Sequence, residues 1–255
     1  MHNILSHLRI KKIMPKKTKS KDAAATPAGP AIVPIQCADK LFDTAPPQDH
    51  PASMPRGSRI AVIADPGRGK SSLIGNQLCR SSPWAAVYVI HGAAGSQEYD
   101  LVQHTKLTWE AATPDFFAAE SARHKKQPLA LIVDDCAYAD LNRKEKSNAY
   151  ACLQHACTHH NVTCWLASHS LTQLVPRLRR ACDIMCIWPP TTGGHDQVPY
   201  LARTLGLPRQ SLQFAFDVAA SRGPHSFLCI YQVPPKGRSR IMIDCEHPID
   251  VGLRF

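Results

Sequence analysis

Short apolar runs alternate with longer amphipathic segments over most of this 255-residue chain. An apolar run rich in β-branched residues predicts a buried strand, and an amphipathic segment after it predicts a helix. The predicted strands are residues 59–63, 85–90, 129–133, 162–167 and 183–188. The predicted helices are residues 114–126, 141–159 and 171–181, a helix that opens at Lys70, and two short helices within residues 198–220. This alternation predicts a doubly wound α/β fold with a mostly parallel sheet and right-handed crossovers.

The most apolar run and the C-terminal strands add detail to this prediction. Residues 129–133 (LALIV) are wholly apolar, which is typical of a central parallel strand that is covered on both faces. Residues 226–232 and 239–244 are joined by a turn-rich segment that contains Pro234, Pro235 and Gly237, which predicts an antiparallel hairpin. Pro176 is expected to break or kink the helix at residues 171–181.

The first 57 residues differ in composition from the rest of the chain and are predicted to form a largely disordered basic tail. They are rich in lysine, alanine, proline and serine, although residues 31–37 could add an edge strand. The ordered domain is therefore expected to cover residues 58–255. Seven basic residues and no acid lie within residues 9–21: Arg9, Lys11, Lys12, Lys16, Lys17, Lys19 and Lys21.

The whole chain is basic as well, because 30 Lys and Arg residues outnumber 20 Asp and Glu residues, for a formal net charge of +10 at pH 7. This excess, concentrated in the tail, favours a polyanionic partner, and nucleic acid is the first candidate. A solvated tail or a nuclear-import signal explains the same basic run equally well.

Membrane and secretory classes are not indicated by the sequence. It has no apolar run of about 18 residues, so no membrane partner is predicted, and its N-terminus does not read as a secretory signal. The ten cysteines are therefore interpreted as reduced thiols of an intracellular protein, several of them packed as small hydrophobic side chains. Cys152, Cys157, His159 and His160 could be assembled into a zinc site, but their spacing matches no standard finger, which favours buried thiols and exposed histidines.

Residues 59–74 (RIAVIADPGRGKSSLI) join an apolar strand to a helix through a turn-rich segment. This is the context that a P-loop requires, and the pattern G-x-x-x-x-G-K-[ST] is met except at its first position, where Ala64 stands. Glycines and a helix N-terminus present backbone amides to phosphate. Lys70 is expected to reach the β- and γ-phosphates of ATP, and the Ser71 hydroxyl to bind Mg²⁺. The predicted nucleotide-binding residues are Ala64, Asp65, Pro66, Gly67, Arg68, Gly69, Lys70, Ser71 and Ser72. A chance glycine-rich turn is the alternative.

Two acids, Asp134 and Asp135, directly follow the apolar run at residues 129–133. Their position predicts that they lie at the carboxyl end of a central strand, beside the P-loop. Asp134 is expected to hold Mg²⁺ through its water shell, and Asp135 to orient or deprotonate the attacking water. The alternative is a pair of acids that caps the next helix or turn.

A polar segment also ends the predicted strand at residues 162–167. Ser168 and His169 stand where a side chain can sense the γ-phosphate of a bound nucleotide. Ser168 or Ser170 could instead cap a helix.

Three arginines lie within four residues, at positions 177, 179 and 180. They are compatible with a solvated helix face or with a patch that faces DNA. One of them could instead complete the site of a neighbouring subunit as an arginine finger, and Arg179 and Arg180 are the candidates for this role.

Taken in order, four segments resemble the FtsK–HerA superfamily of P-loop ATPases. The resemblance is to the viral branch, the poxvirus-type virion DNA-packaging ATPases that also occur in giant viruses, virophages and polinton-like elements. The segments are GRGKSS at the Walker A loop, YVIHGAAGSQEYDL at the second strand, LIVDDC at the Walker B strand, and LVPRLRRACD after the fourth strand. Members commonly place Gln at the sensor position, where this chain has Ser168 and His169.

The resemblance implies an ATP-hydrolysing translocase of double-stranded DNA that packages a viral genome into capsids, with ATP and Mg²⁺ as cofactors. It also implies a homo-oligomeric ring, usually a hexamer or pentamer, and a capsid protein as a partner. The expected location is the host cytoplasm or nucleus during virion assembly, or the virion. Two other classes stay open: a P-loop kinase that acts on a nucleotide or small molecule, and a nucleotide-dependent DNA-binding protein without turnover.

Overall fold

The computed structural model describes residues 54–81, 83–91, 99, 103–134, 143–174, 176–190, 197–234 and 240–249. Nine strands of this part of the chain form one sheet in the order β3-β2-β4-β5-β1-β6-β7-β8-β9. The strands are β1 Arg59–Ile63, β2 Ala86–Ile90, β3 Thr105–Leu107, β4 Leu129–Val133, β5 Val162–Ser168, β6 Ile184–Ile187, β7 Leu228–Tyr231, β8 Ile241–Ile243 and β9 His247–Pro248. The helices are α1 Lys70–Arg80, α2 Pro114–Arg123, α3 Arg143–His160, α4 Pro176–Ala181, α5 Gln197–Leu205 and α6 Arg209–Arg222.

The sheet is parallel from β3 to β6 and antiparallel from β6 to β9. The predicted α/β class and the predicted C-terminal hairpin of β7 and β8 are therefore confirmed. Strands β3 and β9 were not predicted, because β3 is a three-residue edge strand with two exposed side chains and β9 has only two residues. Neither strand carries an apolar run that a sequence pattern can detect.

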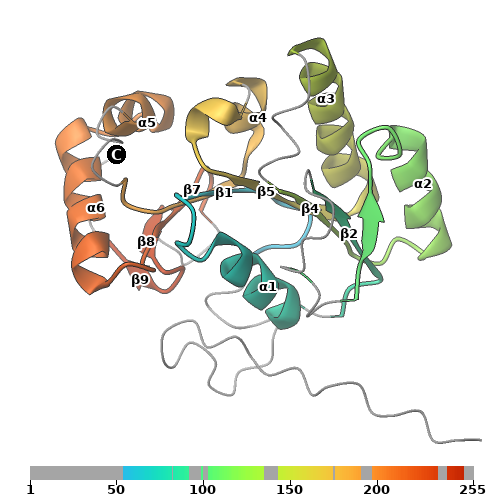
Figure 1. Cartoon of the computed structure of the whole chain (residues 1–255), viewed down its shortest axis with the longest axis horizontal. Helices are drawn as coiled ribbons and strands as arrows, with labels where there is room; N and C mark the ends of the chain where they lie inside the picture. Colours follow the sequence, from blue (N-terminus) through green and yellow to red (C-terminus); the bar gives the residue numbers. More distant parts are fainter. Residues whose placement is uncertain are drawn as a thin grey trace, which may run out of the picture. The chain divides into compact units, whose positions relative to one another are not determined.

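Helices cover both faces of the sheet, as a doubly wound fold requires (Figure 1). Helix α1 lies on one face, where Leu73, Ile74 and Leu78 pack with Ile60 and Val62 of β1. Helices α2 to α6 lie on the other face, where their apolar side chains pack with the strands in a second core cluster. Successive residues of a strand point to opposite faces, so the position of a residue along its strand decides which cluster it joins.

Strands β4 and β5 form the middle of the parallel part, and every one of their residues is buried. Each has a parallel neighbour on both sides, since β4 pairs with β2 and β5, and β5 pairs with β4 and β1. This confirms that the wholly apolar run at residues 129–133 is a central strand covered on both faces.

The helix predicted at residues 171–181 is interrupted at Pro176, as expected. A single 3₁₀ turn, Leu171–Gln173, comes first, and its N-terminus is capped by Ser170, whose Oγ accepts a hydrogen bond from the amide of Thr172. Helix α4 then begins at Pro176. Proline is well suited to the first position of a helix because the amide there has no intrahelical partner.

Residues 1–53 of the predicted basic tail, which include the edge strand at residues 31–37, lie outside the described residues, whereas its last four residues, 54–57, are described. Met54 is only 4% exposed, and its backbone amide donates to Oε1 of Gln77 at 3.2 Å. The side chain of Arg56 donates to the carbonyl oxygen of Ser81 at 2.6 Å. The chain from Met54 onward is thus packed against α1 and its C-terminal end.

The cysteines and histidines that could suggest zinc do not converge on one point. Cys152 and Cys157 are buried, and Sγ of Cys152 donates to the carbonyl oxygen of Ala112. His159 is exposed, and the rings of His155, His159 and His160 pack on one another at the end of α3. The predicted buried thiols and the exposed His159 are confirmed, whereas His160, predicted to be exposed, is only partly exposed. Among the described helices, none is both long enough and apolar enough to cross a membrane.

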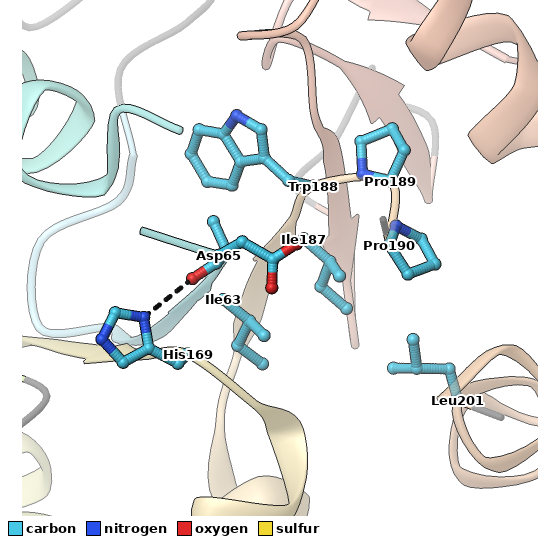
Figure 2. A pocket seen from close by; sticks show the side chains of 9 residues that line it. Ile63, Asp65, His169, Ile187, Trp188, Pro189, Pro190 and Leu201 are labelled. Atoms are coloured by element: carbon cyan, nitrogen blue, oxygen red, sulfur yellow. Dashed lines mark hydrogen bonds between the residues drawn. The ribbon is translucent and has the colours of Figure 1, made fainter. Parts of the chain in front are cut away.

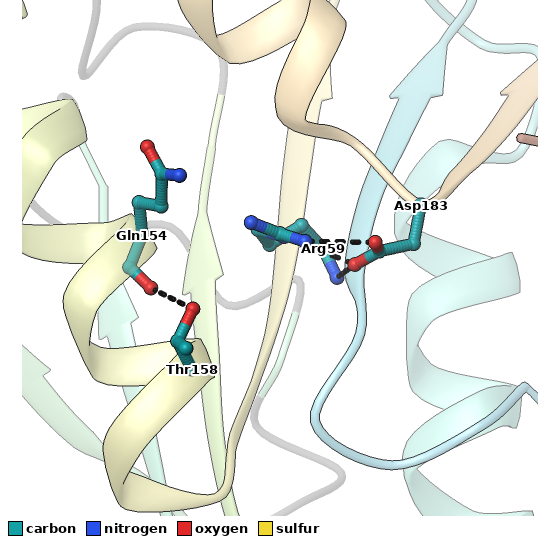
Figure 3. Close-up of polar contacts among 4 residues, drawn as sticks. All are labelled: Arg59, Gln154, Thr158 and Asp183. Carbon is teal, nitrogen blue, oxygen red and sulfur yellow. Dashed lines mark hydrogen bonds and ion pairs between the residues drawn. The ribbon is translucent and has the colours of Figure 1, made fainter.

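Arg59 and Asp183 join the start of β1 to the residue before β6 through three hydrogen bonds (Figure 3). The Asp183 carboxylate accepts from the Arg59 backbone amide at 2.8 Å, from Nε at 3.0 Å and from Nη2 at 2.8 Å. The side-chain hydrogen bond that Arg59 donates to Asp183 also raises the pKa of Arg59.

We expect Asp183→Ala to lower the free energy of unfolding by about 1–2 kcal/mol, because a backbone amide and a guanidinium lose a charged acceptor that is partly screened by solvent. Denaturant titration of the purified protein measures this change. Asp217→Ala is the control, since Asp217 accepts one exposed hydrogen bond from Gln213, and it should cost no more than about 0.5 kcal/mol. Equal losses in the two variants would contradict the structural role given to Asp183.

Candidate functional site

Two glycines of the loop between β1 and α1 adopt left-handed backbone conformations, as the predicted glycine-rich turn requires. Gly67 has φ 74° and Gly69 has φ 97°, which lie in the left-handed region that favours glycine. Ala64 is not among the residues with positive φ, so the alanine at the first position of the pattern causes no backbone strain of this kind. Its amide donates to the carbonyl oxygen of Ser168 at 3.1 Å.

The N-terminus of α1 is built to receive an anion. The first amides of a helix have no intrahelical acceptor, and the aligned peptide dipoles leave a partial positive charge there. Gly69 occupies the N-cap position and offers no side-chain acceptor to these amides, and the first turn of α1 holds no acidic residue. A phosphate group would therefore meet the positive end of the helix dipole at this point, with no acidic side chain in the first turn to repel it.

Lys70 opens α1, is only 8% exposed, and reaches back across the loop. Its Nζ donates to the carbonyl oxygen of Ala64 at 2.9 Å and lies 3.0 Å from Nδ1 of His169. The same ring nitrogen lies 3.3 Å from the Ala64 oxygen, and Figure 2 shows the imidazole turned toward the start of the loop beside Asp65. The lysine of the predicted P-loop and the histidine that ends β5 are thus in contact.

Asp134 directly follows β4 and lies at the same edge of the sheet as the P-loop. Only β5 separates β4 from β1, and the register pairs Val133 with Leu166 and Ile63 with Ser168. Ala130 and Ile132 of β4 pack in the cluster that contains α1, so the alternation along the strand directs Asp134 to that face as well. The carboxylate of Asp134 is buried at 4% exposure.

His91 is a partner of Asp134 that sequence reasoning missed. It follows β2, the other neighbour of β4, and its Nε2 lies 3.1 Å from Oδ2 of Asp134. The argument that placed Asp134 at this edge also applies to His91, because the carboxyl ends of adjacent parallel strands lie at the same edge of a sheet. This histidine contacts the buried acid from the side opposite the P-loop strand.

The two sensor candidates are separated by the face on which each lies. Ser168 is fully buried, and its Oγ donates to Oε1 of Gln173 at 2.6 Å, on the side of the helices α2 to α6. His169 is the next residue, so its side chain takes the other face and contacts Lys70. The helix-capping alternative is realised by Ser170, as described above.

The arginines of α4 occupy different environments. Arg179 is 7% exposed, its guanidinium carbon lies 4.8 Å from the centroid of the Tyr200 ring, and its Nε and Nη1 have no hydrogen-bond partner among the described residues. Arg177 and Arg180 are exposed, and Nε of Arg180 donates to the carbonyl oxygen of Pro176 at 3.4 Å. Only Arg177 and Arg180 are therefore open to solvent.

A second contact missed from the sequence holds the P-loop at Arg68. Its Nη1 donates to the carbonyl oxygen of Pro224 at 3.0 Å, and Nδ1 of His225 lies 3.2 Å from the Arg68 carbonyl oxygen. No local pattern can reveal this contact, because the partners lie more than 150 residues apart in the sequence. The turn between α6 and β7 thus fixes the middle of the loop.

A small open hollow, with a cavity volume of about 20 Å³, lies beside the start of the P-loop (Figure 2). It is lined by the last residues of β1 and β6, by residues that follow β1, β5 and β6, and by one residue of α5: Ile63, Ala64, Asp65, His169, Ile187, Trp188, Pro189, Pro190 and Leu201. The hollow places open space next to the loop at the carboxyl end of the sheet, where ligands bind in open α/β folds.

The predicted residues that the structure brings together are compatible with a magnesium–nucleotide site. Hard oxygen donors are what Mg²⁺ requires, and the Ser71 hydroxyl in the first turn of α1 and the Asp134 carboxylate supply them on one face of the sheet. Ser72 follows in the same turn, and Asp65, Pro66 and Arg68 belong to the loop. Asp135 lies outside the described residues.

No protein-family model and no curated protein sequence matches the chain. Among solved structures, the DNA-packaging ATPase B204 from Sulfolobus Turreted Icosahedral Virus matches with a TM-score of 0.53 and 16% identity, covering 77% of this chain and 100% of that chain. The genome packaging NTPase B204 from Sulfolobus turreted icosahedral virus 2 in complex with sulfate matches with a TM-score of 0.52 and 16% identity, covering 75% of this chain and 97% of that chain. The same NTPase in complex with ATP-gammaS matches with a TM-score of 0.51 and 17% identity, covering 76% of this chain and 98% of that chain. The fold expected from the resemblance to viral packaging ATPases is confirmed.

Proposed function

We propose that this protein is a P-loop ATPase of the viral FtsK–HerA branch that translocates double-stranded DNA and packages a viral genome. The observation that carries the proposal is the contact geometry at one sheet edge, where Lys70 spans the P-loop and buried Asp134 faces the same helix. The fold match to viral packaging ATPases, one of which is covered over its full length, supports the same activity. The net charge of +10 supports a polyanionic cargo.

In this proposal, each residue of the edge has one task. The amides of the loop and of the first turn of α1 hold the phosphates, and Lys70 neutralises the β- and γ-phosphates. Ser71 and Asp134 would hold Mg²⁺, which would supply positive charge to offset the developing charge on the phosphate oxygens. His169 contacts the ammonium of Lys70 and is thereby placed to register a change at the γ-phosphate.

The acid that activates water is proposed to be Asp135. We expect Asp135→Asn to bind ATP with wild-type affinity but to hydrolyse it about 10²–10⁴-fold more slowly, the range for loss of a general base. Binding of a fluorescent ATP analogue and phosphate release, measured on the same preparation, separate the two effects. Asp217→Asn, an exposed substitution on α6, is the control. An ATP hydrolysis rate in Asp135→Asn equal to that of the wild type would contradict the proposal that Asp135 activates water.

The arginine that completes a neighbouring site is proposed to be Arg180, because it is exposed while Arg179 packs against Tyr200. We expect Arg180→Ala to reduce hydrolysis by roughly 10³–10⁵-fold, the range found for arginine fingers. Mixing Arg180→Ala subunits with Lys70→Ala subunits should restore part of the activity, because each supplies what the other lacks. Arg179→Ala, mixed in the same way, is the matched control and should not show this rescue. If only the mixture of Arg179→Ala and Lys70→Ala subunits recovers hydrolysis, Arg179 rather than Arg180 completes the neighbouring site.

The test of the function as a whole is ATP hydrolysis with and without duplex DNA over a range of protein concentrations, paired with negative-stain images. A DNA-translocating ring predicts stimulation by DNA, a steep dependence on protein concentration, and closed rings in the images. Hydrolysis that is indifferent to both DNA and concentration would contradict it. Phosphorylated product from nucleoside monophosphates would support the kinase instead, and tight ATP binding without turnover would support the non-hydrolysing DNA-binding protein.

A further inference from the structure

Three cysteines meet in the antiparallel part of the sheet, away from the residues assigned to the nucleotide. Cys186 lies on β6, Cys229 on β7, and Cys245 in the turn after β8. Their sulfur atoms all lie within 4.8 Å of one another, and the three residues are 0%, 0% and 1% exposed. We call this group the thiol cluster.

The register of the sheet accounts for the close approach. Cys186 and Cys229 are directly opposed on antiparallel strands. The amide of Gln232 donates to the carbonyl oxygen of Asp183 at 2.9 Å, so that pair is hydrogen-bonded. Alternation along the ladder makes the Cys186–Cys229 pair, three positions further, a non-hydrogen-bonded one, in which side chains come closest. Both thiols point into the same core cluster as Cys245.

We propose that Cys186, Cys229 and Cys245 bind one thiophilic d¹⁰ metal ion, Cu⁺ or Zn²⁺, as three thiolates. Metal–sulfur bonds of about 2.3 Å place sulfurs that share an ion about 4 Å apart, which needs only a small contraction of the cluster. Thiolates select Cu⁺ and Zn²⁺ over harder ions. Each thiol gives up its proton as a metal–sulfur bond forms, so three protons are released and no redox partner is needed.

The number of ligands bears on which ion is preferred. Among the described residues, no further histidine, cysteine or carboxylate joins the group. Three thiolates suit three-coordinate Cu⁺, whereas structural Zn²⁺ sites take four ligands. The experiment therefore includes both ions.

A buried cation stands beside the thiol cluster. Arg80, the last residue of α1, is 8% exposed. Burial lowers the pKa of its guanidinium, and the nearby Glu246 and Cys245 act in the opposite direction. Three thiolates around Cu⁺ or Zn²⁺ carry net negative charge, and the Arg80 guanidinium is placed to offset part of it. Burial also raises the pKa of Cys186, so the ion has to displace bound protons.

The test is metal content after anaerobic reconstitution of the full chain with Cu⁺ or with Zn²⁺, followed by removal of loosely held ion with a chelator. We expect about one equivalent of one ion per chain in the wild type, and loss of that equivalent in Cys186→Ala, Cys229→Ala and Cys245→Ala. Cys182→Ala is the matched control, since Cys182 is equally buried but belongs to the other core cluster, and it should keep the ion.

A second measurement needs no variant. The X-ray absorption spectrum of the metal-loaded wild type should show three sulfur neighbours at about 2.2–2.4 Å. Coordination by nitrogen or oxygen alone, failure to retain one equivalent of either ion, retention of the ion in all three alanine variants, or a Cys186–Cys229 disulfide in non-reduced peptide maps would each overturn the proposal. The outcome is independent of whether the protein hydrolyses ATP.

Discussion

Lys70→Ala is expected to abolish detectable ATP hydrolysis, with kcat falling by roughly 10²–10³-fold or more, the loss typical of one group that stabilises developing charge. The physical reason is the position of its buried ammonium, which lies 2.9 Å from the Ala64 carbonyl oxygen at the start of the loop. No other described side chain of the loop is placed to replace that charge, since Arg68 is bound to the turn at Pro224. Phosphate release under saturating ATP measures the effect.

The control for Lys70→Ala is Lys106→Ala, an exposed lysine on the edge strand β3. It removes the same charge from the chain without touching the loop, so its kcat should stay within twofold of wild type. Thermal unfolding of both variants shows whether the loss comes from the site or from the fold. Hydrolysis by folded Lys70→Ala at the wild-type rate would remove the P-loop from the mechanism.

Asp134→Asn is expected to lower kcat by about 10²–10³-fold at saturating ATP, in keeping with the several kcal/mol that a positioned metal ion supplies. The substitution keeps the shape of the side chain but removes the negative charge that Mg²⁺ requires. We expect the Mg²⁺ concentration for half-maximal hydrolysis to rise as well. Both quantities come from rates measured over a Mg²⁺ titration.

His91→Ala separates the role of Asp134 from that of its neighbour. It removes the imidazole 3.1 Å from the Asp134 carboxylate but leaves the charge, so a smaller change in the Mg²⁺ dependence is expected. Wild-type kcat and wild-type Mg²⁺ dependence in Asp134→Asn would contradict the metal role of this acid.

The parallel sheet and the P-loop could be predicted from the sequence because their signals are local. The apolar runs at β1, β2, β4 and β5 are bounded by turn residues, and the helix after the loop begins at the lysine of the motif. The short strands β3 and β9 could not be predicted, since they exist only through pairing with a neighbour that the sequence does not identify.

The sequence predicted part of the candidate site. The remaining assignments required knowing to which face of the sheet or helix each side chain points. Lys70 and Asp134 share an edge of the sheet because β1 and β4 are parallel and only β5 separates them, an order that the sequence does not give. Ser168 and His169 could not be separated without knowing the phase of β5. Arg179 and Arg180 look alike in sequence, and only the packing of Arg179 on Tyr200 distinguishes them.

The most direct test of the account is a structure of the full chain determined with Mg²⁺ and ATP-gammaS. The account predicts the γ-thiophosphate within hydrogen-bond distance, about 3 Å, of Lys70 Nζ, and Mg²⁺ between that group, the Ser71 hydroxyl and the Asp134 carboxylate. Nucleotide bound elsewhere on the chain, or bound at the loop with Mg²⁺ remote from Asp134, would contradict it.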